Sequence, residues 1–144
     1  MVKQKVKEDK IIVYGESLGT GVSVEVAQNK NYAGIILESP FTSMTNVGKK
    51  HYPFLPVHFL LKDKFESYKK ITNVSIPILI IHGKVDKIVP YQMGKKMYEL
   101  ANEPKLFYSQ EYGDPRMEYE LSLIQICTRR RSARFTLPWP PGHK

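Results

Sequence analysis

Short apolar runs recur along the chain and predict the strands of a sheet. Three of them consist mainly of β-branched and large aliphatic residues, and they end at Gly15, at a Ser-Pro pair or at Gly83. Continuous apolar runs of this length, bounded by turn residues, are typical of strands buried on both faces. The predicted strands cover residues 10–14, 33–37 and 76–82, and a shorter run predicts a fourth at 105–108.

Apolar residues at helical spacing follow the first and the third run. Residues 18–29 carry apolar side chains at positions 18, 22, 26 and 27, which form a helical stripe. Residues 91–101 predict another helix, with inward positions at Met93, Met97, Tyr98 and Leu100 or Ala101. Apolar strands that alternate with helices favour an α/β fold, in which helices flank a mainly parallel sheet.

Residues 41–75 separate the second and third predicted strands and are longer than a simple crossover. Pro53 and Pro56 interrupt this covering segment, so we expect one or two short helices there, lying over the strand ends. The segment is rich in aromatic residues: Phe41, Tyr52, Phe54, Phe59, Phe65 and Tyr68.

The composition limits the classes of protein that this chain can represent. A chain of 144 residues that is 42% hydrophobic and 25% charged can bury the core of one domain. Its apolar runs are too short to cross a bilayer, and the first ten residues lack an apolar signal core, so we expect a cytoplasmic protein. The single cysteine, Cys127, excludes an intrachain disulfide and a cysteine zinc site.

The formal net charge of +8 divides equally between residues 1–115 and residues 116–144. Lys is the only basic residue of the first part, whereas Arg supplies five of the six basic residues in the second. We therefore expect an α/β domain over residues 1–119 and, over residues 120–144, a basic, proline-containing tail outside that domain. The tail is either a solvated end, sequence foreign to the domain, or an arginine arm for nucleic acid. For the domain itself we expect no nucleic-acid partner.

The first strand leads directly into Gly15-Glu16-Ser17-Leu18-Gly19, which the first helix follows. Strand, tight turn and helix are the context that a G-x-S-x-G nucleophile elbow requires. In such an elbow Ser17 occupies a strained backbone conformation that projects its hydroxyl above the sheet. Gly15 and Gly19 are small because a side chain there would strike the neighbouring strand or helix. The backbone N–H of Leu18, at the helix N-terminus, would stabilise an oxyanion.

A nucleophilic serine needs a base that an acid orients. Asp86 is the candidate acid because it lies in the loop after the third strand, where open α/β sheets place their sites. Glu38, which ends the second strand, is the rival acid, and Asp86 could instead only cap the next helix. We interpret His82 as a packed structural histidine rather than the base. His51 and His58 lie in the covering segment and would reach the site only in an unusual fold.

Three segments resemble the C-terminal half of an α/β-hydrolase of the serine-aminopeptidase-like branch, which includes the alpha/beta-hydrolase-domain-containing proteins. They agree in order and spacing, within a resemblance that covers residues 8–119, and comprise residues 12–21, 37–43 and 77–90. The resemblance implies that Ser17 is the nucleophile and that Asp86, in a His-Gly-x-x-Asp-x-x-Val-Pro motif, is the acid of the triad.

The chain departs from the family at two places. The family carries its catalytic histidine just beyond the last strand, where this chain has Pro115, and His143 lies too far along to replace it. The family also has several strands before the elbow, and a loop there supplies a second oxyanion N–H. Ten residues before Ile11 cannot hold them, so we expect impaired catalysis and an exposed sheet edge that favours aggregation.

The resemblance implies a serine hydrolase that cleaves an ester, thioester or amide through an acyl-enzyme on Ser17. The covering segment would line the acyl pocket, and its aromatic residues favour a small-molecule acyl substrate with an apolar part. No metal or organic cofactor is implied. The alternative is a non-catalytic pseudo-hydrolase or an interaction module with a basic tail.

Overall fold

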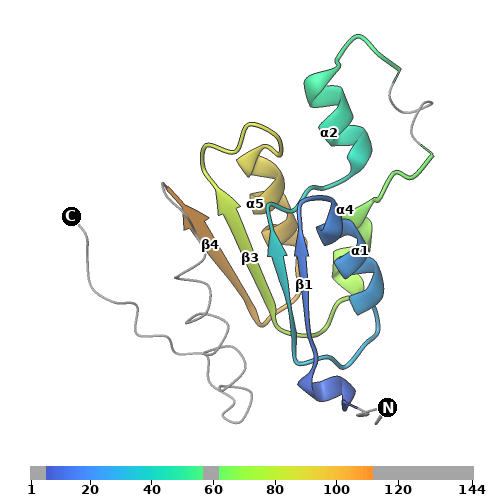
Figure 1. The fold of residues 1–144 in the computed structure, drawn as a ribbon, viewed down its shortest axis with the longest axis vertical. Helices are drawn as coiled ribbons and strands as arrows, with labels where there is room; N and C mark the ends of the chain where they lie inside the picture. Colours follow the sequence, from blue (N-terminus) through green and yellow to red (C-terminus); the bar gives the residue numbers. More distant parts are fainter. Residues whose placement is uncertain (1–5, 57–61, 112–144) are drawn as a thin grey trace, which may run out of the picture.

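Four parallel strands form one sheet in the order β1-β2-β3-β4 (Figure 1). The structure is a computed structural model that describes residues 6–56 and 62–111. The strands lie at each predicted position, but all four end one to two residues later than predicted, and the first three also begin one to two residues later. Their bounds are Ile12–Glu16 for β1, Gly34–Glu38 for β2, Ile78–Gly83 for β3 and Lys105–Gln110 for β4. The predicted α/β fold with a parallel sheet is therefore confirmed.

Helices connect the strands, as parallel pairing requires. Helix α1 links β1 to β2, and α5 links β3 to β4, while α2, α4 and the turn η2 form the longer crossover between β2 and β3. None of the described helices is long and apolar enough to span a membrane. The bounds are Glu8–Lys10 for η1, Leu18–Ala27 for α1, Met44–His51 for α2, Ser67–Lys70 for α4, Ile71–Asn73 for η2 and Tyr91–Leu100 for α5.

The main core lies between the sheet and the helices α1, α4 and α5. Because side chains alternate along a strand, Ile35, Leu37, Ile78 and Ile80 face these helices, together with the fully buried Met97. Residues of the opposite parity, Ile36, Leu79 and Ile81, form a second buried cluster on the other face of the sheet. Both faces of β2 and β3 are therefore buried, as their continuous apolar runs predict.

Of the apolar stripe that identifies helix α1 in the sequence, only Ala27 packs into the core. Leu18, Val22 and Val26 are 53%, 50% and 47% exposed. The helix packs instead through small side chains and one valine, which allow it to approach β1 closely. The buried residues are Thr20, Gly21, Ser23, Val24 and Ala27.

Strand β1 is an edge strand in the described part of the sheet, which corrects its prediction as a buried strand. Gly15 is its only buried residue, and Tyr14 is 54% exposed. The apolar composition of the run correctly predicts a strand, but composition does not reveal whether a neighbour lies on each side.

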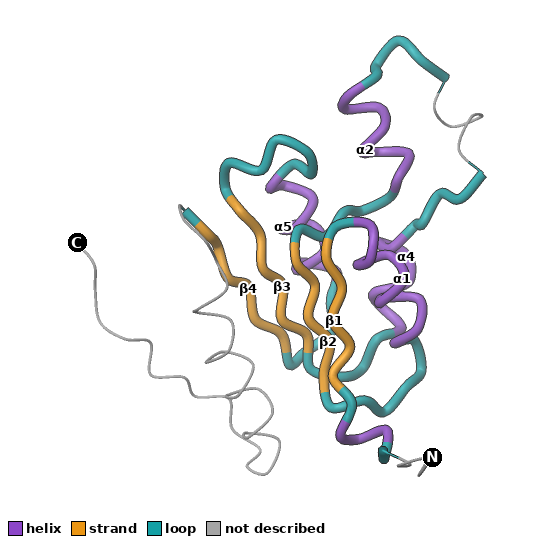
Figure 2. Tube along the Cα trace, in the orientation of Figure 1, coloured by secondary structure: helices purple, strands orange, loops and turns teal. Residues whose placement is uncertain are grey.

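The described part of the covering segment contains two short α-helices, α2 and α4, which agrees with the one or two expected from its sequence. Helix α2 lies beyond the carboxyl ends of the strands, on the same side of the sheet as the loops that follow β1 and β3 (Figures 1 and 2). Ser43 caps it, because its side chain accepts a hydrogen bond from the backbone N–H of Asn46 at 3.1 Å.

Candidate active site

Ser17 occupies the strained turn between β1 and α1. Its φ of 48° and ψ of −116° lie in a region that residues other than glycine rarely adopt. Its backbone N–H donates to the carbonyl of Glu38 at 2.9 Å, and its carbonyl accepts from the Thr20 hydroxyl at 2.6 Å. These bonds hold the turn against the strain. Within the described residues, the exposed Ser17 hydroxyl does not cap α1, so it remains available for chemistry.

The two glycines of the elbow differ in their surroundings. A Cβ on Gly15 would lie 2.3 Å from Oγ of Ser23 and 2.6 Å from the carbonyl oxygen of Gly19, so only glycine fits there. A Cβ on Gly19 would meet no heavy atom within 4 Å among the described residues. The steric reason expected for Gly19 is therefore wrong for this part of the chain, because Gly19 faces open space.

Leu18 is the first residue of α1, so its N–H belongs to the helix turn that has no acceptor within the helix. This position gives the N–H a place beside the Ser17 hydroxyl and at the positive end of the helix dipole. The geometry suits the stabilisation of an oxyanion that develops next to Ser17.

Asp86 lies in the loop between β3 and α5, where backbone donors hold its carboxylate. Its Oδ1 accepts from the N–H groups of Ile88 at 2.8 Å and Val89 at 2.9 Å. Burial by itself raises the pKa of Asp86. The hydrogen bonds from Val89 and Ile88, with smaller effects from the Ser39 hydroxyl and from His82, outweigh burial, and the resulting pKa lies below the usual 3.8. The carboxylate is thus ionised at neutral pH.

Ser17 and Asp86 lie at the same edge of the sheet. Both follow the carboxyl ends of parallel strands, and only β2 separates β1 from β3, a lateral offset of about 10 Å. Ser39 follows β2 and so lies between them. Its N–H donates to the Ile81 carbonyl at 2.8 Å, and its hydroxyl forms a hydrogen bond with Asp86. Ser39 was not among the predicted site residues. Its position directly after a strand, at the edge that carries Ser17 and Asp86, was the available signal.

Glu38, the rival acid, is directed toward another partner. Its carboxylate accepts a hydrogen bond from the hydroxyl of Tyr14 on the neighbouring strand β1. The backbone carbonyl of Glu38 contacts the elbow, because it accepts a hydrogen bond from the N–H of Ser17.

His82 is fully buried in β3, which agrees with a structural role. Its Nε2 lies 2.9 Å from the Val89 carbonyl and 3.7 Å from Oδ2 of Asp86. Burial lowers the pKa of His82 below 6.5, although the Val89 carbonyl and the Asp86 charge oppose this effect. The ring packs edge-on against Tyr91, with the ring centres 5.7 Å apart.

The other histidines have different positions relative to the site. His51, at the end of α2, lies beside the acid loop, which comprises residues 84–90 between β3 and α5 and carries Asp86. Its Nε2 lies 2.8 Å from the Ile88 carbonyl. The sequence reasoning missed this contact because it depends on how the covering segment folds back. His58, Pro115 and His143 lie outside the described residues.

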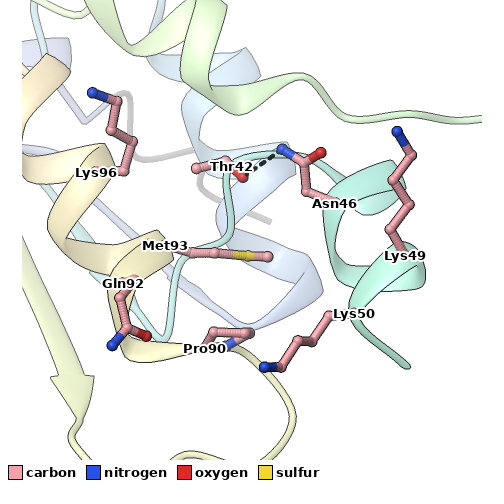
Figure 3. Close-up of a pocket in the computed structure, with 8 residues that line it drawn as sticks. All are labelled: Thr42, Asn46, Lys49, Lys50, Pro90, Gln92, Met93 and Lys96. Carbon is pink, nitrogen blue, oxygen red and sulfur yellow. Dashed lines mark hydrogen bonds between the residues drawn. The ribbon is translucent and has the colours of Figure 1, made fainter. Parts of the chain in front are cut away.

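An open groove of about 510 Å³ lies between α2 and α5, next to the acid loop (Figure 3). Met93 projects across it from α5, and on the side of the covering segment Nδ2 of Asn46 donates to the Thr42 hydroxyl at 3.0 Å. Among the residues that the structure describes, none of the aromatic side chains expected around an acyl pocket lines this groove. Its lining residues are Thr42, Asn46, Lys49, Lys50, Pro90, Gln92, Met93 and Lys96.

Comparison of the sequence with known proteins gives matches over the whole described region. Residues 2–110 match the prolyl oligopeptidase family. An uncharacterized protein of Mycobacterium tuberculosis, Rv2307c, is 42% identical over 98 residues, which cover 68% of this chain and 35% of that protein. The lysophosphatidylserine lipase ABHD12 of Danio rerio is 34% identical over 122 residues, which cover 72% of this chain and 32% of the lipase. The chain thus spans about a third of the length of these curated relatives.

Comparison of the structure gives the same fold. Acetyl xylan esterase 1 of Thermoanaerobacterium sp. JW/SL YS485 superposes with a TM-score of 0.68 at 19% identity, over 86% of this chain and 47% of the esterase. The resemblance to α/β hydrolases is therefore confirmed. With its parallel sheet, its strained serine turn and a family match over residues 2–110, the chain belongs to the prolyl oligopeptidase family of α/β hydrolases.

Proposed function

We propose that Ser17 is the nucleophile of a serine hydrolase and that Asp86 is the acid of its triad. The observation that carries the proposal is the strained, exposed Ser17, at the same sheet edge as a carboxylate held ionised by backbone donors. Ser17 attacks an acyl carbonyl, the N–H of Leu18 stabilises the oxyanion, and the acyl-enzyme is then hydrolysed by water.

The proposed mechanism needs a histidine that Asp86 orients, and we assign this role to neither His51 nor His82, because Nε2 of each lies at a backbone carbonyl. Oδ1 of Asp86 accepts hydrogen bonds from the N–H groups of Ile88 and Val89, whereas Oδ2 lies 3.7 Å from Nε2 of His82. Oδ2 is therefore the oxygen that would accept from an incoming histidine. Since Pro115 occupies the place of the family's histidine, we propose that the rate of acyl-enzyme formation in this chain is several powers of ten below that of an enzyme with a complete triad.

The proposed substrate is a small acyl compound with an apolar part, and the scissile bond is an ester, thioester or amide. The zebrafish relative, described as a lipase of lysophosphatidylserine, favours a carboxylic ester among these bonds. Met93 and Pro90 offer apolar surface in the groove beside the acid loop, where the acyl part would lie.

A fluorophosphonate probe tests the nucleophile directly, because it forms a covalent bond only with an activated serine. We expect slow labelling of the chain at Ser17 and none in Ser17→Ala. Ser75→Ala, at an exposed serine before the amino end of β3, is the matched control and keeps the label. A folded chain that never reacts at Ser17 contradicts the proposal and supports a non-catalytic domain.

A further inference from the structure

Both the N–H groups and the carbonyl groups of Ile88 and Val89 have hydrogen-bond partners. Their two N–H groups donate to Oδ1 of Asp86, at 2.8 and 2.9 Å. Their two carbonyls lie against histidines from different elements: His51 of α2, at 2.8 Å from the Ile88 oxygen, and His82 of β3, at 2.9 Å from the Val89 oxygen. We propose that His82 and His51 are positioning residues that fix this dipeptide and thereby aim the Asp86 carboxylate. The inference rests on the proposed function, which makes Asp86 the acid.

His82 fixes the inner side of the acid loop. A carbonyl oxygen only accepts, so the bond to Val89 requires a proton on Nε2 of His82. In this neutral tautomer Nδ1 carries a lone pair, and Nδ1 is buried without a hydrogen-bond partner in the described part of the chain. The ring has one orientation available, since reversing it would remove the bond to Val89.

Gly94 of α5 makes room for this ring. A Cβ on Gly94 would lie 2.2 Å from Nδ1 of His82 and 2.9 Å from its Cγ. Tyr91, one turn earlier on the same helix, packs edge-on against the imidazole. The absence of a side chain at Gly94 and the Tyr91 ring together hold His82 where its N–H meets the acid loop.

These contacts distinguish positioning from direct proton transfer. One nitrogen of His82 is bonded to the Val89 carbonyl and the other faces Gly94, so neither can reach a substrate. Burial, which lowers the pKa of His82, keeps the ring neutral and preserves the tautomer that the bond requires. His82 therefore acts on Asp86 through the backbone.

His51 fixes the outer side of the same dipeptide. It is the last residue of α2 and is exposed, so water competes for its bond to Ile88 more than for the buried bond of His82. We expect a smaller effect from its removal. The contact also joins the covering segment, which forms one wall of the groove, to the loop that carries the acid.

The experiment measures the pKa of Asp86 by carbon-13 NMR of the side-chain carboxyl in the full 144-residue chain. His82→Gln retains an N–H that can reach the Val89 carbonyl, whereas His82→Leu removes it at similar size. We expect the pKa of Asp86 to rise toward 3.8 in His82→Leu and to stay low in His82→Gln, with a smaller rise in His51→Ala. A merely structural role would lower thermal stability without moving this titration. An unchanged Asp86 pKa in a folded His82→Leu overturns the proposal.

A measurement on the unmodified chain decides the question if His82→Leu fails to fold. Nitrogen-15 shifts of the imidazole report its tautomer, and we expect a proton on Nε2 at neutral pH. A proton on Nδ1 instead overturns the proposal. The fluorophosphonate test is independent, because an unlabelled Ser17 beside a responsive Asp86 contradicts only the hydrolase function. A labelled Ser17 beside an unresponsive Asp86 contradicts only the positioning role.

Discussion

Replacing Gly94 by alanine tests the packing beneath the acid loop, because two effects on the free energy of unfolding oppose each other there. In the middle of a helix, alanine is favoured over glycine by about 1 kcal/mol. The added Cβ, however, would lie 2.2 Å from Nδ1 of His82, a distance that real side chains do not tolerate. Overpacking of this kind costs about 1–3 kcal/mol.

The imidazole relieves the overlap by moving away from Gly94. A movement large enough to break the bond from Nε2 to the Val89 carbonyl leaves a buried carbonyl unsatisfied, which costs about 1–3 kcal/mol. Strain and bond loss are alternative responses to one contact, so they do not add. We expect Gly94→Ala to lower the free energy of unfolding by up to about 2 kcal/mol after the helix preference of about 1 kcal/mol is subtracted.

Urea unfolding followed by circular dichroism measures this change. Gly19→Ala is the matched control, because Gly19 also lies in a helix and a Cβ there meets no atom within 4 Å among the described residues. We expect that variant to be as stable as the unmodified chain or more stable. The reasoning is refuted if Gly94→Ala is as stable as Gly19→Ala, because His82 would then not fill the space beside α5.

Three further predictions concern the site. Ser17→Gly removes the cost of a positive φ, so it should stabilise the chain by about 1 kcal/mol in urea unfolding while it abolishes fluorophosphonate labelling; a loss of stability contradicts the strain. Burial holds the pKa of His82 below 6.5, so the unfolded chain binds a proton that the folded chain does not. The contribution of neutral His82 to the free energy of unfolding is therefore fully present above about pH 6.5 and is lost as the pH falls below that value. Urea midpoints at pH 7.5 and 5.5 should therefore differ more in the unmodified chain than in His82→Gln, and equal differences contradict the prediction. Pro115→His should accelerate the hydrolysis of p-nitrophenyl acetate, and an unchanged rate counts against Pro115 standing in the place of the base.

The two central strands were predictable because they are buried runs rich in β-branched residues, a pattern with few alternatives. Residues 76–82 and 33–37 became β3 and β2, with both faces covered. The packing face of α1 was not predictable from hydrophobicity. Val22 and Val26 point outward, since close approach to β1 selects small side chains such as Gly21 and Ala27 for most of the contact.

Sequence reasoning placed those candidate site residues whose positions are tied to a local motif. The positive φ of Ser17 follows from the Gly-x-Ser-x-Gly turn, and the carboxylate of Asp86 lies in the loop after β3 as expected. Ser39, His51 and Gly94 were missed because their roles arise from tertiary contacts. Nothing in the local sequence states that His51 meets a loop 37 residues away, or that Gly94 lies against an imidazole.

The order of the strands gives the two halves of the site different local stabilities. Ser17 follows β1, which has a strand partner on one side only in the described sheet, whereas Asp86 follows β3, which is paired on both sides. Fluctuations that detach a sheet edge need less free energy than those that open its interior. Amide protons of β1 should therefore exchange with deuterated solvent sooner than those of β3, and the turn that carries the proposed nucleophile Ser17 should open more often than the loop that carries Asp86.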